Sequence, residues 1–179
     1  MMTETPFTRT FDVSHLGNAP QKQQVVADAA ERAALQQQFE LLALDTFEAD
    51  LVIAPWGQLG VKVDGRLRAD LVQACVVTLQ PVPSHMDHRF SLSFLPADAI
   101  AADPKTVAEA EVIVIYDEED PPEPLEGNSI DLGPILAEQF ALALDPYPRA
   151  PGATLVNDGD EDVDNGASPF AALSKLRDK

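Results

Sequence analysis

Cysteine is almost absent from the sequence. Cys75 is the only one among 179 residues, so no intramolecular disulfide can form and a reducing compartment is the simplest setting. Its neighbours Ala74, Val76 and Val77 are apolar. Because apolar surroundings disfavour the thiolate, they predict a buried structural thiol with a raised pKa rather than a nucleophile.

The sequence also lacks a hydrophobic run that could cross a membrane, which takes about 20 apolar residues. Residues 1–17 (MMTETPFTRTFDVSHLG) contain neither a basic leader nor an apolar stretch. Secretion and membrane insertion are therefore disfavoured. We expect a cytoplasmic protein with no membrane partner.

Basic side chains are scarce. Lysine and arginine number 12 against 30 aspartates and glutamates, which gives a formal net charge of -18. Proteins bind phosphate backbones by displacing counterions with Lys and Arg, so bare nucleic acid is disfavoured as the primary partner. An electrostatic field of this sign attracts basic ligands, and RNA-binding proteins are common ligands of that kind.

The familiar motifs of catalysis and cofactor binding are missing too. Gly57 and Gly60 (GQLG) lack the lysine and helix start of a phosphate loop, and neither GxSxG nor HExxH occurs. His85 and His88 on an expected strand point to opposite faces, which suits no shared metal. The acidic run from Asp158 departs from the calcium-loop pattern at its glycine and glutamate positions. We expect no catalytic residue, metal or cofactor.

Hydrophobic periodicity predicts a strand and then a helix in the first quarter of the chain. Residues 7–13 alternate between apolar and polar side chains, as in a half-buried strand. Asp28 and Glu31 then have the spacing of a helix capping box. They predict a helix that runs to Leu44.

The residue pattern in the middle of the chain predicts several short strands. Residues 47–53 alternate, and residues 59–63 and 67–79 flank Asp64-Gly65, a dipeptide that predicts a tight type I′ hairpin turn. Residues 86–94 and 112–115 indicate two more strands. Strands close in sequence and bracketed by helices predict an α+β fold with a mostly antiparallel sheet. The pattern fits an open sheet and a partly closed barrel equally.

Two acidic stretches interrupt these elements. Residues 117–126 (DEEDPPEPLE) hold six acids and three prolines, which predicts an exposed loop, and residues 157–168 form a second such stretch. We therefore expect one α+β domain over residues 1–152. Residues 153–179 are expected to be an acidic flexible tail with a short helix near its end.

Between the acidic stretches, the sequence predicts a well-marked helix followed by a stiff turn. Asp131 can cap a helix that has Pro134 in its first turn, and Asp145 should end it because Pro146 follows. The prolines of Asp145-Pro-Tyr-Pro-Arg149 hold an aromatic ring and a guanidinium in fixed relation. The turn could serve recognition, or Tyr147 could merely cover the core while Arg149 pairs with an acid.

Several segments of the chain resemble one known family. They are Gln73–Val82 (QACVVTLQPV), Ile130–Gly133, Glu138-Gln139, Leu142–Arg149 and Pro151-Gly152, with support from Glu31-Arg32 and residues 169–173. In order and spacing they are similar to the YceD family of large ribosomal RNA subunit accumulation proteins.

The resemblance implies a role in accumulation of 23S rRNA, hence in synthesis, processing or assembly of the large subunit, without a defined catalytic activity. Many members carry Cys-x-x-Cys where this chain has Cys75-Val76-Val77-Thr78, so the second sulfur is missing. A zinc site of the usual cysteine-rich kind is therefore improbable here.

The leading hypothesis is a non-catalytic adaptor or assembly chaperone. Its acidic surface would engage a basic ribosomal protein or rRNA-processing factor on the pre-ribosomal large subunit. The candidate partner-binding residues are Asp131, Gln139, Asp145, Tyr147 and Arg149.

Two alternatives remain open. One is a metal-dependent ribonuclease that uses some of the clustered carboxylates. The other is direct binding of RNA through Lys62, Arg66 and Arg68, for which weak and salt-sensitive affinity is expected because these bases are few.

Overall fold

The structure, a computed structural model, describes residues 7–100, 121–125 and 127–154. Its elements in chain order are β1 (Thr10–Asp12), the 3-10 helix η1 (Val13–His15), β2 (Gln21–Val26), α1 (Ala29–Gln38), β3 (Ala43–Trp56), β4 (Gly60–Ala74), β5 (Pro81–Pro96), α2 (Ala97–Ile100), β6 (Glu123–Leu125), β7 (Ser129–Asp131) and α4 (Leu132–Ala143).

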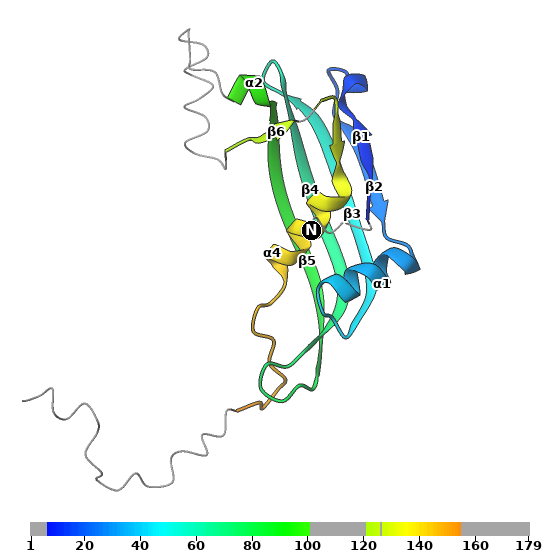
Figure 1. Cartoon of the computed structure of the whole chain (residues 1–179), viewed down its shortest axis with the longest axis vertical. Coiled ribbons are helices and arrows are strands. Elements are labelled where there is room, and N and C mark those ends of the chain that lie inside the picture. The colour runs from blue at the N-terminus through cyan, green and yellow to red at the C-terminus, as the bar shows by residue number, and fades with distance from the viewer. Residues whose placement is uncertain (1–6, 101–120, 126, 155–179) are drawn as a thin grey trace, which may run out of the picture.

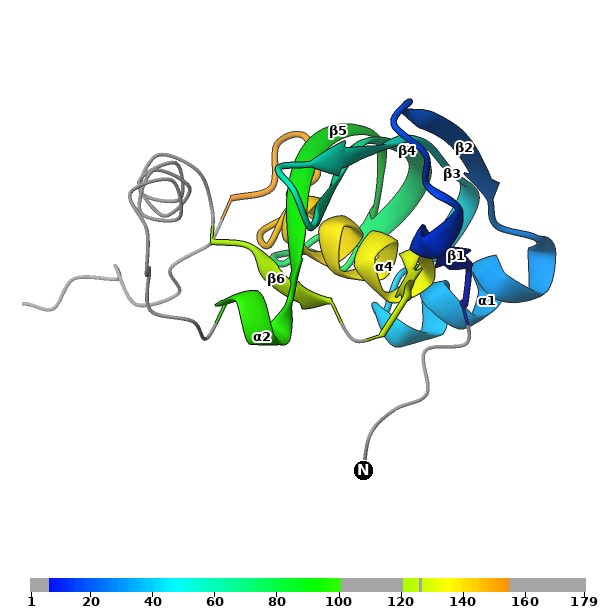
Figure 2. The same ribbon diagram turned by 90° about the horizontal axis from the view of Figure 1, so that it is seen from above.

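A five-stranded sheet dominates the molecule (Figure 1). Its order is β2-β3-β4-β5-β6, with antiparallel pairing except between β5 and β6, which run parallel. The sheet is curved, and its concave face carries α1, α4 and β1, which pairs with β7 (Figure 2). Within the described ranges no ladder joins β2 to β6, so the sheet is open rather than closed into a barrel. The predicted α+β class is confirmed.

Strand alternation sends one set of side chains into the core and the other into solvent. In β4, Val63, Leu67 and Ala69 are fully buried, and the residues between them are polar or charged apart from Gly65. The core is closed by an edge-to-face aromatic cluster, in which Phe140 of α4 lies 5.3 Å from both Phe39 and Phe47 between ring centroids. Phe7 adds a further contact to Phe47 at 5.5 Å. The aromatic cluster thus fastens α4 to the sheet.

The capping box at the start of α1 is confirmed, but the helix is shorter than predicted. The Asp28 carboxylate accepts from the Glu31 amide, and the Glu31 carboxylate accepts from the Asp28 amide. The helix ends at Gln38 rather than Leu44 because Glu40 turns the backbone with φ 53° and the Leu42 amide donates to Val72 of β4. Strand pairing therefore overrides helix propensity beyond Gln38.

The predicted hairpin at Asp64-Gly65 is wrong. Both residues lie inside the continuous strand β4, and the chain reverses earlier, between β3 and β4, where Gly57 has φ 59°. Gly65 has another role, because Phe90 of β5 lies directly over it. A Cβ atom at Gly65 would come within 2.2 Å of the Phe90 Cζ, so the missing side chain makes room for the ring.

Other boundaries differ at the two ends of the fold. The opening strand is only Thr10–Asp12 and is followed by η1. Residues Glu123–Leu125, predicted as acidic loop, form the edge strand β6 because Leu125 is buried against the core. The predicted strand at 112–115, the acidic stretch at 157–168 and the terminal helix lie outside the described residues.

We expect Gly133→Ala to destabilise the protein. A Cβ atom at Gly133, in the first turn of α4, would lie 2.0 Å from the Phe7 carbonyl oxygen, and that segment cannot yield because Phe7 is fully buried. Overpacking of this kind costs about 1–3 kcal/mol, more than the helix propensity of roughly 1 kcal/mol that alanine contributes.

The measurement is the free energy of unfolding in guanidinium chloride. Gly17→Ala is the control, because nothing lies within 4 Å of a Cβ atom there. Equal midpoints for the two variants would contradict the close approach of α4 to the Phe7 backbone.

Candidate partner-binding face

Two of the five candidate partner-binding residues hold α4 in place. The Asp131 carboxylate accepts from the Gly133 amide at 3.0 Å, which caps the helix, and from the Arg9 amide at 2.7 Å. Gln139 is 8% exposed, and its Oε1 lies 3.3 Å from His88 Nε2 on β5. These contacts turn both side chains towards the protein, and their proposed contact with a partner stays a prediction.

The other three candidates lie in the turn that follows α4. Three hydrogen bonds fix the backbone of this turn. The Asp145 carboxylate accepts from the Tyr147 amide at 2.9 Å, the Asp145 carbonyl accepts from Gln73 Nε2 at 2.9 Å, and the Pro148 carbonyl accepts from the Val76 amide at 2.9 Å. Its conformation is therefore set by contacts to the end of β4 and to the turn beyond it.

The side chains of this turn nevertheless face solvent. Tyr147 is 71% exposed and Arg149 is also exposed, whereas Pro148 is buried. Tyr147 does not cover the core, and Arg149 forms no ion pair within the described part of the chain. An aromatic ring held in the open on a fixed backbone costs little entropy on binding, which favours recognition over packing.

Cys75 holds the two segments together. Its Sγ accepts from the amides of Val77 and Thr78 at 3.4 Å and from the Ala150 amide at 3.3 Å. The thiol is buried, as predicted, but the predicted rise in pKa is wrong. The Ala150 amide and the Thr78 hydroxyl, with the other amides, outweigh burial and lower the pKa of Cys75 to about 6. The donor that lowers the pKa most, the Ala150 amide, lies 75 positions away in sequence, so the neighbours of Cys75 could not predict it.

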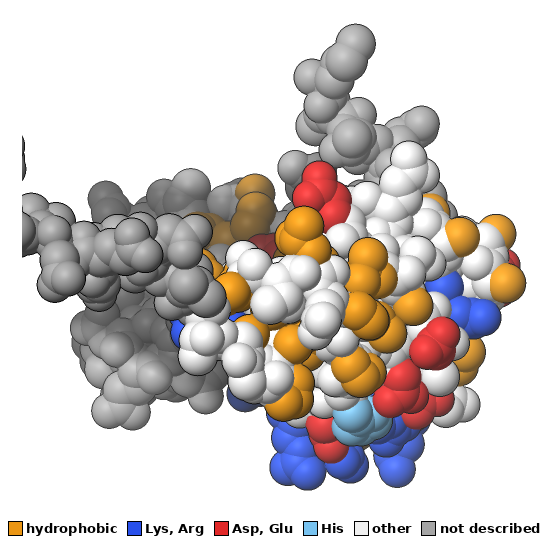
Figure 3. All heavy atoms as spheres, turned by 90° about the horizontal axis from the view of Figure 1, so that it is seen from below, with side chains coloured by type: hydrophobic (Ala, Val, Ile, Leu, Met, Phe, Trp, Pro, Cys, Tyr) orange, Lys and Arg blue, Asp and Glu red, His pale blue; other side chains and the backbone are white. Residues whose placement is uncertain are grey.

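Exposed hydrophobic side chains gather at this end of the molecule. The structure describes eight large hydrophobic residues with high exposure, and five of them belong to the segments that meet here. They are Leu42, Val76, Leu79, Leu142 and Tyr147, which we call the end patch. Figure 3 shows hydrophobic side chains across the middle of this end, bordered by acidic ones, with most basic side chains along one edge. Sequence reasoning found only Tyr147, because exposure depends on how the segments converge.

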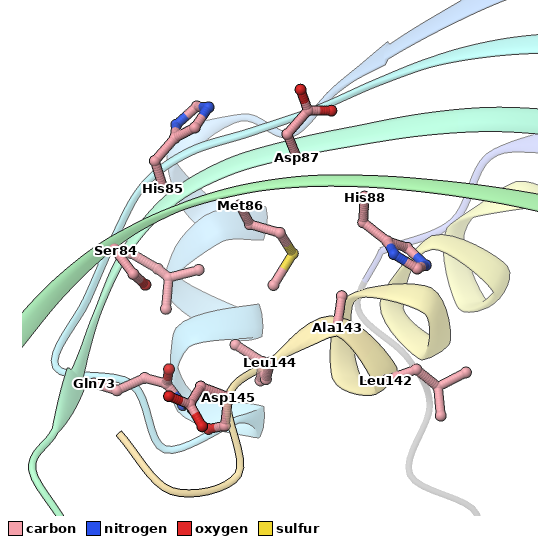
Figure 4. Close-up of a pocket in the computed structure, with 11 residues that line it drawn as sticks. Gln73, Ser84, His85, Met86, Asp87, His88, Leu142, Ala143, Leu144 and Asp145 are labelled. Carbon is pink, nitrogen blue, oxygen red and sulfur yellow. The ribbon is translucent and has the colours of Figure 1, made fainter. Parts of the chain in front are cut away.

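A cavity of about 410 Å³ opens beside the end patch, between β5 and the C-terminal end of α4. Figure 4 shows Met86 and His88 of β5 pointing towards α4, while His85 and Asp87 point to the opposite face of the sheet. The apolar lining is Leu71, Met86, Leu142, Ala143 and Leu144; Gln73, Ser84, His88 and Asp145 supply polar groups. The cavity could take one apolar side chain.

Acidic side chains without ion-pair partners border the same region. Glu138 lies one helical turn before Leu142 and is exposed, and Glu40 and Asp145 are exposed too. None of the three forms an ion pair with another described residue. Burial and the nearby charge of Glu138 raise the pKa of Glu123, so Glu138 lies close enough to Glu123 to disfavour a second negative charge there.

On the convex face of the sheet, by contrast, two arginines are paired with carboxylates. Arg66 Nε donates to Asp87 at 2.8 Å, and Arg68 donates to Glu48 and Asp50 at 2.8 and 2.7 Å. The Arg66 guanidinium lowers the pKa of Asp87 to about 2. Two of the three cations proposed for RNA binding are thus already neutralised.

The described ranges contain neither a metal-binding cluster nor a membrane-spanning helix. No group of three or more His, Cys, Asp or Glu side chains in them is arranged to hold a metal ion. No helix in them is long and apolar enough to span a membrane.

Comparison with known proteins gave one match. Residues 63–177 match the model of a family described as large ribosomal RNA subunit accumulation protein YceD. The match covers more than half of the chain, including most of β4, all of β5 and α4, and the turn after α4. No curated protein and no solved structure matches.

We expect the Cys75 thiol to titrate near pH 6. Absorbance of the thiolate at 240 nm, followed against pH, should rise with a midpoint at about 6 in the native protein and be absent from Cys75→Ser. Because the folded-state pKa lies below the ordinary value of about 9, its stabilising effect is complete above pH 9 and is lost as the pH falls through 6.

The free energy of unfolding should follow the same course. The advantage of the native protein over Cys75→Ser is expected to shrink steadily from pH 9 to pH 6. A titration midpoint above 9 would show that burial dominates and that the amide donors do not act as described.

Proposed function

The chain belongs to the YceD family of large ribosomal RNA subunit accumulation proteins, and on that premise we propose that it is a non-catalytic cytoplasmic factor that binds a basic protein of the pre-ribosomal large subunit. The family supports a role in accumulation of the large-subunit rRNA. The adaptor or chaperone action and the basic partner are our proposal.

One observation carries this proposal: the turn after α4 presents Tyr147 and Arg149 on a backbone fixed by hydrogen bonds. Tyrosine and arginine are enriched among residues that dominate binding energies, particularly where the surface is preorganised. The end patch surrounds this turn with further apolar surface. Such a face suits a protein partner, because it combines aromatic, aliphatic and charged groups.

The charge of the molecule favours a basic partner over RNA. The net charge is -18, and the acids next to the end patch have no cation to neutralise them within the described part. On the convex face Arg66 and Arg68 would have to give up their carboxylate partners before they could bind phosphate. RNA binding through these two arginines would therefore be weak.

We expect removal of the protein from cells to lower 23S rRNA relative to 16S rRNA. Tyr147→Ala combined with Arg149→Ala should restore it poorly, because the variant loses the exposed ring and guanidinium while the buried contacts of the turn remain. Leu59→Ala is the control, since Leu59 is 65% exposed in the turn at the other end of β4. Circular dichroism should show that both variants fold.

Two further measurements separate the proposal from its alternatives. Crosslinking in growing cells should capture basic ribosomal or processing proteins with the native protein and fewer with the double variant. Defined cuts in precursor rRNA incubated with purified protein and Mg²⁺ or Mn²⁺ would instead establish a ribonuclease. Normal 23S levels without the protein would refute the proposed role.

A further inference from the structure

The cavity beside α4 and the end patch form one continuous surface. Leu142 belongs to both, and Asp145 lines the cavity while its carbonyl and carboxylate fix the turn that carries Tyr147. A ligand anchored in the cavity would therefore extend over the exposed ring. A ligand longer than the cavity would continue across the end patch.

The surroundings of the cavity identify the charge of the ligand. Glu138 lies one turn before Leu142 on α4, and Asp145 lines the cavity just beyond the helix; neither has a cationic partner among the described residues. The only Lys or Arg in the turn itself is Arg149. A ligand with acidic groups would add to the existing repulsion, whereas Lys or Arg groups would relieve it.

We propose that this surface binds a basic amphipathic segment of a partner protein, with one aliphatic or aromatic side chain in the cavity between β5 and α4 and flanking Lys or Arg side chains against Glu138 and Asp145. The inference rests on the proposed function and adds to it the place and chemistry of the contact. Leu142 and Tyr147 form the apolar border over which the segment lies.

Two polar side chains that line the cavity, Gln73 and His88, already have hydrogen-bond partners within the protein. The Gln73 amide is engaged by the Asp145 carbonyl, and the His88 ring lies within hydrogen-bond distance of Gln139 and stacks on Phe90 at 6.2 Å. An apolar side chain that enters therefore displaces no contact of these two residues. It would instead meet the apolar lining residues Leu71, Met86 and Leu144.

The experiment uses the full chain and three labelled synthetic peptides in a fluorescence anisotropy titration at about 150 mM salt, at which the Debye length of about 8 Å screens long-range attraction. The first peptide has leucine and lysine at amphipathic helical spacing. In the second, serine replaces every leucine, and in the third, glutamate replaces every lysine. We expect saturable binding of the first peptide at one site and at least tenfold weaker binding of the other two.

Paired variants locate the site. Leu142→Asp should weaken binding of the first peptide by roughly tenfold, whereas Leu59→Asp should change it by less than about twofold. Leu142 and Leu59 are 71% and 65% exposed, and both substitutions add one negative charge, so general attraction is matched. Ser84→Trp, which fills the cavity from the β5 side, should also weaken binding.

Four results would overturn the proposal. Three are equal effects of Leu142→Asp and Leu59→Asp, equal binding of the serine peptide, and saturable binding of labelled oligouridine RNA to the protein that Leu142→Asp weakens, which would assign the surface to nucleic acid. A chain ending at residue 168 that binds at least tenfold more tightly would show that residues 169–179 occupy the surface instead. Any of these results combined with low 23S rRNA in cells lacking the protein would refute this binding site and leave the role in 23S rRNA accumulation intact.

Discussion

The packing of Phe140 into the aromatic cluster on the concave side of the sheet is the contact on which the rest of this end depends. It places α4 across β4 and β5, with edge-to-face contacts to Phe39 and Phe47 at 5.3 Å. The N-terminal end of α4 is fixed separately by the Asp131 cap and by the close approach of Gly133 to the Phe7 backbone. With both ends of the helix held, the turn beyond it can reach only the end of β4 and the following residues.

The partner-binding face is consequently a product of tertiary structure. Tyr147 and Val76 lie 71 positions apart in sequence, yet the Val76 amide binds the Pro148 carbonyl and the Ala150 amide binds the Cys75 sulfur. Loosening of either segment would disperse the end patch and open the cavity. A surface built in this way exists only in the folded protein, so binding and stability are coupled at this end.

Features set by neighbouring residues were predictable from the sequence. The capping box of Asp28 and Glu31, the Asp131 cap and the α+β class all follow from local spacing and periodicity. The predicted hairpin at Gly65 was wrong because the prediction used only local turn propensity. The glycine instead leaves room for the ring of Phe90, which belongs to another strand. The prediction of a raised pKa for Cys75 failed for the same reason. It considered only the apolar neighbours of the cysteine in sequence, whereas the Ala150 amide that lowers the pKa lies 75 positions away. Predictions were thus correct where the interacting residues are close in sequence and wrong where they are far apart.

Thr78 shows how the turn after β4 is held together in this chain. Cys75 is the only sulfur-containing residue of this turn. The Thr78 amide and hydroxyl bind that sulfur, which also receives the amides of Val77 and Ala150. Several weak N–H···S and O–H···S contacts to one polarisable atom can tie two segments without a second thiolate, provided that the sulfur carries much of a negative charge. The Ala150 contact that contributes most to the low pKa of Cys75 therefore also holds the residues after Tyr147 against the turn beyond β4.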